Sequence, residues 1–182
     1  MDAPSDRDLV LRANRGETEA FGELVHRTQT AVYNVCYRLL GERREAEDLT
    51  QETFIRAWER LHTFDLERPF LPWIRRVAAN LCLNRISARA PASLELDEER
   101  DETEPSSAPA LLIEQRHQAE RIRTVLVSLP ARYRMIIELR HFQELSYEDI
   151  AAALDRPLSD VKSDLFRARK LLAEKLKDES SF

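Results

Sequence analysis

Apolar residues recur at the spacing of an α-helix along nearly the whole chain, and few segments alternate with the period of two that a half-buried strand shows. The spacing predicts helices over 6–13, 18–40, 44–61, from Pro72 to about 90, 111–126 and 132–142. Gly41 follows the second of these, at the position where glycine commonly ends a helix. The sequence therefore predicts an all-α protein.

The helical pattern breaks at about residues 89–110, where proline, serine and acidic residues gather. Residues 89–115 hold 2 basic and 8 acidic groups, whereas the whole chain has a net charge of −5. A polar segment of like charge cannot bury enough apolar surface to fold, so a flexible tether is predicted. The predicted organisation is a helical domain over 1–90, an acidic flexible linker over 91–112 and a second helical domain over 113–182.

Several classes of function are disfavoured by composition. The three glycines all lie within the first 41 residues, so no glycine-rich phosphate loop can follow, and a nucleotide-dependent enzyme is not expected. The histidines and cysteines share no ligand spacing, so neither a metal ion nor another cofactor is predicted. Cys36 and Cys82 fall on or beside apolar helix faces and are predicted to be buried thiols rather than a disulfide. Without a membrane-length apolar run or a signal peptide, the expected location is the cytoplasm.

Residues 146–176 are predicted to form a helix-turn-helix. Ser146 is a suitable N-cap for the first helix, Pro157 prevents its continuation, and Ser159 is expected to cap the second helix. The apolar stripe of the second helix comprises Val161, Leu165, Ala168 and Leu172. Its opposite side carries cations and hydroxyl groups: Ser159, Lys162, Ser163, Phe166, Arg167 and Lys170. Such a helix suits the DNA major groove, although a plain helical hairpin with a solvated basic face fits the same pattern.

The helix predicted over 44–61 has two faces of different character. One face is expected to be core and comprises Ala46, Thr50, Phe54, Ala57, Trp58 and Leu61. The other is an acidic stripe that includes one apolar residue, and it comprises Asp48, Gln51, Glu52, Ile55 and Glu59. A solvated face accounts for this pattern, and so does a docking surface for a basic protein partner.

The stretch 68–90 contains five arginines and no acidic residue. Its outward side is predicted to hold Arg76, Ala79, Asn80, Leu83 and Ser87, with Arg75 at one flank and with Ile74, Val77, Ala78, Leu81 and Ala88 on the buried side. Cations and amides beside the aromatic residues Phe64, Phe70 and Trp73 suit an unpaired nucleic-acid strand, which needs charge for phosphates and a pocket for an exposed base. Trp73 is equally compatible with a place in the core.

Three stretches carry a resemblance to a known family. They are EDLTQETFIRAW at 47–58, WIRRVAANLCLNRI at 73–86 and, within 129–172, LPARYRMIIELRHFQELSYEDIAAAL followed by VKSDLFRARKLL. With these motifs in this order, the chain resembles the bacterial extracytoplasmic-function sigma factors of the σ70 family. These are the smallest sigma factors of RNA polymerase, and they have two promoter-reading helical domains, called σ2 and σ4.

The resemblance implies partners and roles for particular residues. Core RNA polymerase would be bound, through the coiled coil of its β′ subunit, by Asp48, Gln51, Glu52 and Ile55. The melted −10 element, with one flipped base, would be read by Phe64, Asp65, Arg75, Arg76, Asn80 and Asn84. The duplex −35 element would be contacted by Ser159, Lys162, Ser163, Phe166, Arg167 and Lys170. The linker would lie in the RNA channel of the polymerase, and an anti-sigma factor would control the protein.

The chain departs from the family pattern within its last two helices. Asp155 stands where glycine is usual, and Phe166 stands where histidine is common. Asp160 and Asp164 replace a common threonine and arginine, which predicts acidic groups on the groove-facing helix, near the phosphates.

Two further hypotheses remain open on the sequence. The chain could be a stand-alone helix-turn-helix regulator, which would bind a palindromic operator without polymerase. It could also be a sigma-like interaction module that sequesters a regulator. All three readings are non-enzymatic.

Overall fold

The computed structural model describes residues 4–89 and 110–178, and within these ranges all regular secondary structure is helical. The N-terminal half comprises α1 (Asp6–Ala13), α2 (Thr18–Leu40), α3 (Arg43–Arg60), the 3₁₀ turn η1 (Leu61–Thr63) and α4 (Phe70–Arg89). The C-terminal half comprises α5 (Ala110–Val127), α6 (Ala131–Ile137), the π-helical turn η2 (Glu138–Phe142), α7 (Tyr147–Leu154) and α8 (Leu158–Asp178). The all-α class is confirmed, whereas most of the predicted linker lies outside the described residues.

Helix α2 is the centre of the N-terminal half, and α1, α3 and α4 all pack against it. Its apolar stripe is buried, as the spacing predicted, and includes Leu24, Val32, Val35 and Leu39. The helix ends at Gly41, which has a φ of 85° and donates its N–H to the carbonyl of Tyr37. A left-handed residue is the usual way to satisfy a terminal carbonyl, and glycine adopts this conformation without steric cost.

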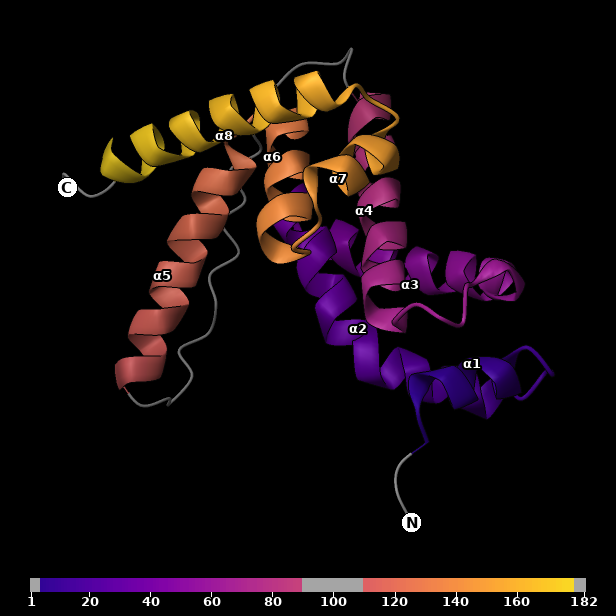
Figure 1. The fold of residues 1–182 in the computed structure, drawn as a ribbon. Coiled ribbons are helices and arrows are strands. Elements are labelled where there is room, and N and C mark those ends of the chain that lie inside the picture. The colour runs from indigo at the N-terminus through magenta and orange to yellow at the C-terminus, as the bar shows by residue number, and fades with distance from the viewer. Residues whose placement is uncertain (1–3, 90–109, 179–182) are drawn as a thin grey trace.

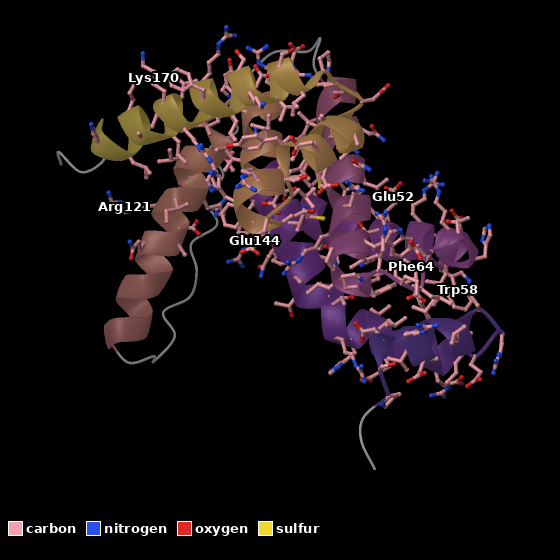
Figure 2. The ribbon with its side chains drawn as sticks, in the orientation of Figure 1. Glu52, Trp58, Phe64, Arg121, Glu144 and Lys170 are labelled. Carbon is pink, nitrogen blue, oxygen red and sulfur yellow. The ribbon has the colours of Figure 1, made fainter. Side chains whose placement is uncertain are left out.

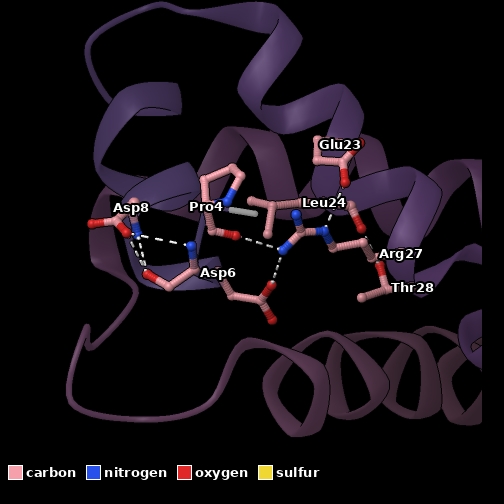
Figure 3. A network of polar contacts seen from close by, with 8 residues as sticks. Pro4, Asp6, Asp8, Glu23, Leu24, Arg27 and Thr28 are labelled. Atoms are coloured by element: carbon pink, nitrogen blue, oxygen red, sulfur yellow. Dashed lines mark hydrogen bonds and ion pairs between the residues drawn. The ribbon is translucent and has the colours of Figure 1, made fainter. Parts of the chain in front are cut away.

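Arg27 of α2 binds the start of α1 (Figure 3). Arg27 Nη1 donates to the carbonyl of Pro4 at 2.9 Å and to Asp6 Oδ1 at 3.1 Å, while its Nε donates to Glu23 Oε1 at 2.8 Å. Leu9 and Val10 of α1 are buried in the core. The short helix is thus fixed both by its apolar face and by its first turn.

Helix α4 differs from the prediction at its start and in its rotation. It begins at Phe70, so Pro72 occupies its first turn, where backbone N–H groups have no intrahelical partner and the missing donor costs nothing. Ala79 is buried rather than outward, and Ala88 is exposed rather than buried. Because α4 packs against both α2 and α3, its buried arc is wider than the single stripe that the spacing suggested.

Cys36 of α2 and Cys82 of α4 are free thiols, and neither has exposed surface. This confirms the predicted burial. A hydrogen bond with Cys36 and burial among apolar groups raise the pKa of the Cys82 thiol well above its usual value. The side chain therefore packs as a small neutral group.

The C-terminal half contains the predicted helix-turn-helix in α7 and α8. Ser146 caps α7 by accepting the N–H of Asp149 at 3.0 Å, and Asp155 ends α7 in the left-handed conformation with a φ of 50°. Ser159 is not the cap of α8, because that helix begins at Leu158, and the carbonyl of Pro157 accepts its first N–H groups. The fixed φ of proline favours helix initiation directly after the turn.

The two halves pack against each other. Helix α8 lies across one end of α5 and α6, and α1 lies at the opposite end of the molecule (Figure 1). Contacts between the halves join α2 to α5, α6 and η2, and join α4 to α6. Among the described residues, no helix is both long and apolar enough to span a membrane.

Candidate nucleic-acid and partner interfaces

The outer face of α8 consists entirely of exposed residues, namely Ser159, Lys162, Ser163, Phe166, Arg167 and Lys170. Figure 2 shows Lys170 on the outer side of this helix. On the opposite side, Val161, Leu165 and Ala168 are buried against the rest of the C-terminal half. The predicted division of α8 into an apolar and a cationic face is therefore present.

Phe166 is the most exposed large apolar side chain among the described residues, with 72% of its surface accessible. It lies between the cations and hydroxyl groups of α8 and belongs to no aromatic pair in the described part of the chain. A ring held in this position could contact the apolar surface of a base in the major groove, such as a thymine methyl group.

Asp164 does not face the groove, contrary to the sequence prediction. Its carboxylate is buried and accepts a hydrogen bond at 2.8 Å from Nη1 of Arg156, in the turn before α8. Asp164 lies three residues after Val161, which places it on the buried side of the helix. Asp160 is exposed, and Arg156 Nη2 lies 3.9 Å from its carboxylate. The ion pair of Arg156 and Asp164 thus removes one negative charge from the outer face and joins the turn to α8.

The flank of α8 contacts η2 through Arg169. Its Nε lies 3.3 Å from Nε2 of His141. Burial, and then the charges of Arg169 and Arg140, lower the pKa of His141 below its usual value. The imidazole is therefore neutral at neutral pH and accepts this hydrogen bond.

The acidic stripe of α3 lies at the surface. Asp48, Gln51 and Ile55 are exposed, and Ile55 has 60% of its surface accessible. Glu52 is half-buried and faces two cations, since its carboxylate lies 3.8 Å from Arg56 Nε and 3.9 Å from Arg85 Nη2. Helix α3 therefore presents acidic and amide groups around an exposed apolar side chain.

Trp58 was predicted to be core, but 39% of its surface is exposed. Its ring meets Phe21 edge to face, with centroids 4.9 Å apart, and its other side lines a surface pocket beside Gly16 and His62. Figure 2 shows Trp58 toward the right of the molecule, and the residue lies in the last turn of α3.

The amide groups predicted for a single strand lie at the surface of α4. Asn80 and Asn84 are exposed, as is Asp65 in the preceding loop, while Arg75 and Arg76 are half-buried. Arg76 Nη2 donates to the carbonyl of Asp149 in α7 at 3.3 Å. The structure thus brings one predicted strand-binding cation against the helix-turn-helix.

Phe64 is not available to a base in this structure, since only 8% of its surface is exposed. Its ring packs edge to face on Phe70 and Trp73, with centroids 5.7 and 5.1 Å away. Leu66 of the same loop also packs against the core, so both large apolar side chains of the loop anchor it. In this state, Phe64 positions the loop that carries Asp65.

Sequence reasoning missed several charged residues that are central to the packing. Glu45 and Glu138 are both buried; Glu45 pairs with Arg85 at 3.3 Å, and Glu138 pairs with Arg38. The last of these pairs joins residues one hundred positions apart, and no local pattern reveals it. Among the described residues, no cluster of histidine, cysteine and acidic side chains could hold a metal ion.

Comparison with known proteins assigns the chain that carries these faces to a family. The model of sigma-70 region 2 matches residues 24–91, and that of sigma-70 region 4 matches residues 119–172. The chain is 32% identical over 179 residues to the extracytoplasmic-function RNA polymerase sigma factor SigW of Bacillus subtilis. The matched region covers 93% of this chain and 95% of that protein. The chain belongs to the extracytoplasmic-function sigma factors.

Other relatives agree with this assignment. The sigma factor is 34% identical over 182 residues to the sigma-E factor of Escherichia coli K12, covering 94% of each chain. It is also similar to the solved structure of CnrH in complex with the cytosolic domain of CnrY, with a TM-score of 0.64 and 26% identity over 96% of this chain and 99% of that chain. The solved structure of the sigma factor RpoE in complex with the anti-sigma factor NepR, from Bartonella quintana, is also similar. Its TM-score is 0.64 and its identity 25%, over 86% of this chain and 96% of that chain. Below, σ2 denotes α1 to α4 and σ4 denotes α5 to α8.

Proposed function

We propose that this sigma factor is a dissociable subunit that binds core RNA polymerase, directs it to promoters and has no catalytic activity of its own. The observation that carries the proposal is the pair of unlike surfaces on two helical domains: an acidic, partly apolar face on α3 and a cationic face on α8. The first suits a basic protein partner, and the second suits duplex DNA. Acting on RNA polymerase would place the protein in the cytoplasm.

The residue roles follow the surfaces. Asp48, Gln51, Glu52 and Ile55 would dock on the β′ coiled coil. Asn80 and Asn84, with Arg75, Arg76 and Asp65, would hold the melted −10 strand. The outer face of α8 would contact the −35 duplex, and residues 91–112 would be the tether between domains 1–90 and 113–182. Because polymerase holds both domains, the second DNA contact becomes intramolecular and gains from effective concentration.

Control by an anti-sigma factor is part of the proposal. One similar solved structure contains an anti-sigma factor, and another contains the cytosolic domain of a second protein. A partner that covers the faces of α3 or α8 would prevent binding to polymerase or to DNA.

Run-off transcription tests the proposed function. The purified protein is incubated with core RNA polymerase and a template that contains the region upstream of its own gene. A new, discrete start site is expected. Binding to DNA without polymerase would favour a stand-alone regulator, and no effect on initiation would favour a sequestering module.

Replacing Asn80 with alanine should reduce open-complex formation about tenfold and leave binding to a closed duplex nearly unchanged. Its amide would contact only an extruded base, whose unstacking costs a few kcal/mol. Permanganate reactivity of the melted region and duplex binding by the holoenzyme measure the two effects. Asn14→Ala, at an exposed asparagine ending α1, is the control. Equal losses in both assays would contradict the assignment of Asn80.

Replacing Arg167 with alanine should flatten the salt dependence of −35 binding. One lost phosphate contact lowers the slope of log K against log salt by about 0.9. The slope is measured by fluorescence anisotropy of the holoenzyme on a −35 duplex at several salt concentrations. Arg15→Ala, which removes an exposed cation between α1 and α2, should leave the slope unchanged. A wild-type slope for the Arg167 variant would show that this residue contacts no phosphate.

A further inference from the structure

One partly buried ion pair crosses the contact between σ2 and σ4. Nε and Nη2 of Arg38, on α2, donate to the two carboxylate oxygens of Glu138, in η2, at 2.7 and 2.9 Å. Only 2% of the Glu138 side chain is exposed, and the Arg38 guanidinium also lies over the ring of Phe142, 4.2 Å from its centroid. A two-pronged arginine-carboxylate pair in a shielded position fixes both the distance and the orientation of the two domains.

Other groups of σ4 gather at the same end of α2. Arg123 Nη1 donates to the carbonyl of Gly41 at 3.1 Å, and Arg134 donates to the carbonyl of Leu39. The last carbonyls of a helix have no intrahelical partner and carry partial negative charge, so cations are favoured there. The side chain of Val127 packs directly on Gly41. Charged groups thus contribute to the docked position of σ4 beside apolar contacts, and the charged groups can exchange their partners for water.

This docked arrangement cannot read two promoter elements at once. Arg76 of the proposed −10 surface touches the backbone of α7, which directly precedes the −35 helix. Elements centred about 25 base pairs apart are roughly 85 Å apart along B-DNA, at about 3.4 Å per base pair. A compact chain of this length has a radius of gyration of about 16 Å, so it is roughly 40 Å across. The two domains must therefore separate before both elements are bound.

We propose that the Arg38–Glu138 pair is an autoinhibitory latch, which holds σ4 against the end of α2 in a closed state that must open for promoter binding. This inference rests on the proposed function. Promoter DNA that carries both elements would bind only the open state, so its apparent affinity is reduced by the fraction of molecules that are open. Weakening the latch would raise that fraction and tighten binding without changing any residue of the two interfaces.

Charge reversal tests the latch in the full-length chain. Spin labels on cysteines placed at Glu19 of α2 and Glu174 of α8, both exposed, report the distance between domains, since Cys36 and Cys82 are buried. Arg38→Glu and Glu138→Arg should each lengthen this distance. Each should also strengthen binding of promoter DNA that carries both elements, in the presence of core RNA polymerase, about tenfold, the effect of losing one partly shielded ion pair. The double variant, which restores a pair of opposite sign, should return both measurements toward the wild-type values.

Arg27→Glu is the matched control. Arg27 is also a paired arginine of α2, with 28% of its side chain exposed against 23% for Arg38, but its partners lie within σ2. It should leave the distance unchanged. Circular dichroism checks that each variant keeps its helices. A salt titration of the unmodified protein needs no substitution at the ion pair, and raising the salt concentration should lengthen the distance between the two spin labels.

The outcomes separate the latch from the proposed function. An unchanged distance in Arg38→Glu and across the salt titration would overturn the latch, as would a folded double variant that stays open. A distance that responds as expected, in a protein that never binds polymerase in any variant, would instead refute the proposed function.

Discussion

Replacing Ile55 with aspartate will lower the affinity for core RNA polymerase about thirtyfold and leave the helical content unchanged. Ile55 has 60% of its surface exposed and lies on the outer face of α3, one turn after Gln51 and Glu52 and one turn before Glu59. An exposed apolar side chain encircled by polar groups is the arrangement that becomes a binding hot spot, where truncation costs about 2 kcal/mol or more. A carboxylate there would also remain unpaired after docking.

The affinity is measured by titrating labelled protein with core RNA polymerase. Ile122→Asp provides the matched control, because Ile122 is also an exposed isoleucine, with 37% of its surface accessible, but lies on α5. Both variants should have the thermal stability of the parent protein. If Ile122→Asp and Ile55→Asp weaken binding to the same degree, the docking surface does not lie on α3.

Replacing Arg156 with alanine will lower the free energy of unfolding of σ4 by about 3 kcal/mol. The substitution leaves the Asp164 carboxylate buried and without its 2.8 Å hydrogen bond, and removing one partner of a buried pair costs about 3–5 kcal/mol. The lower end of this range of free energies applies because 32% of the Arg156 side chain is exposed. Since this pair joins the turn to α8, binding of the −35 element should weaken in parallel.

Urea unfolding followed by circular dichroism measures this effect. Asp164→Ala should cost less, about 1–2 kcal/mol, because the guanidinium of Arg156 can turn toward water. The double variant should lose less stability than the two single variants lose together. The difference is the coupling energy of the pair. Arg12→Ala, which breaks a pair with Glu17 that is nearly half exposed on both sides, should change stability by less than about 0.5 kcal/mol. Additive losses at Arg156 and Asp164 would show that the pair contributes no stability of its own.

The sequence predicts those features that local physics determines. The bounds of α1 and α2 follow from the apolar spacing and from Gly41, and the start of α7 follows from Ser146. The inward position of Asp164 could also have been read, because it lies three residues after Val161 on the buried stripe. Its partner Arg156 could not, because it lies in a turn whose geometry the spacing does not define.

The remaining features depend on contacts between distant segments. The rotation of α4 is set by packing against two helices at once, so Ala79 is buried although a single stripe placed it outward. Phe64 turns inward because Phe70 and Trp73 meet it from the next helix. The pairing of Arg38 with Glu138 has no signal in either local sequence, since each is an ordinary charged residue within a helical pattern.

Gly41 links two events that would otherwise be independent. With a φ of 85° it ends α2, and a Cβ atom added there would come within 2.8 Å of Val127. Any larger residue would therefore disturb the exit of the chain from σ2 and also displace σ4 from its seat. The absence of a side chain at Gly41 consequently governs two things. It sets how the first domain terminates its longest helix, and it sets how firmly the second domain rests on that helix.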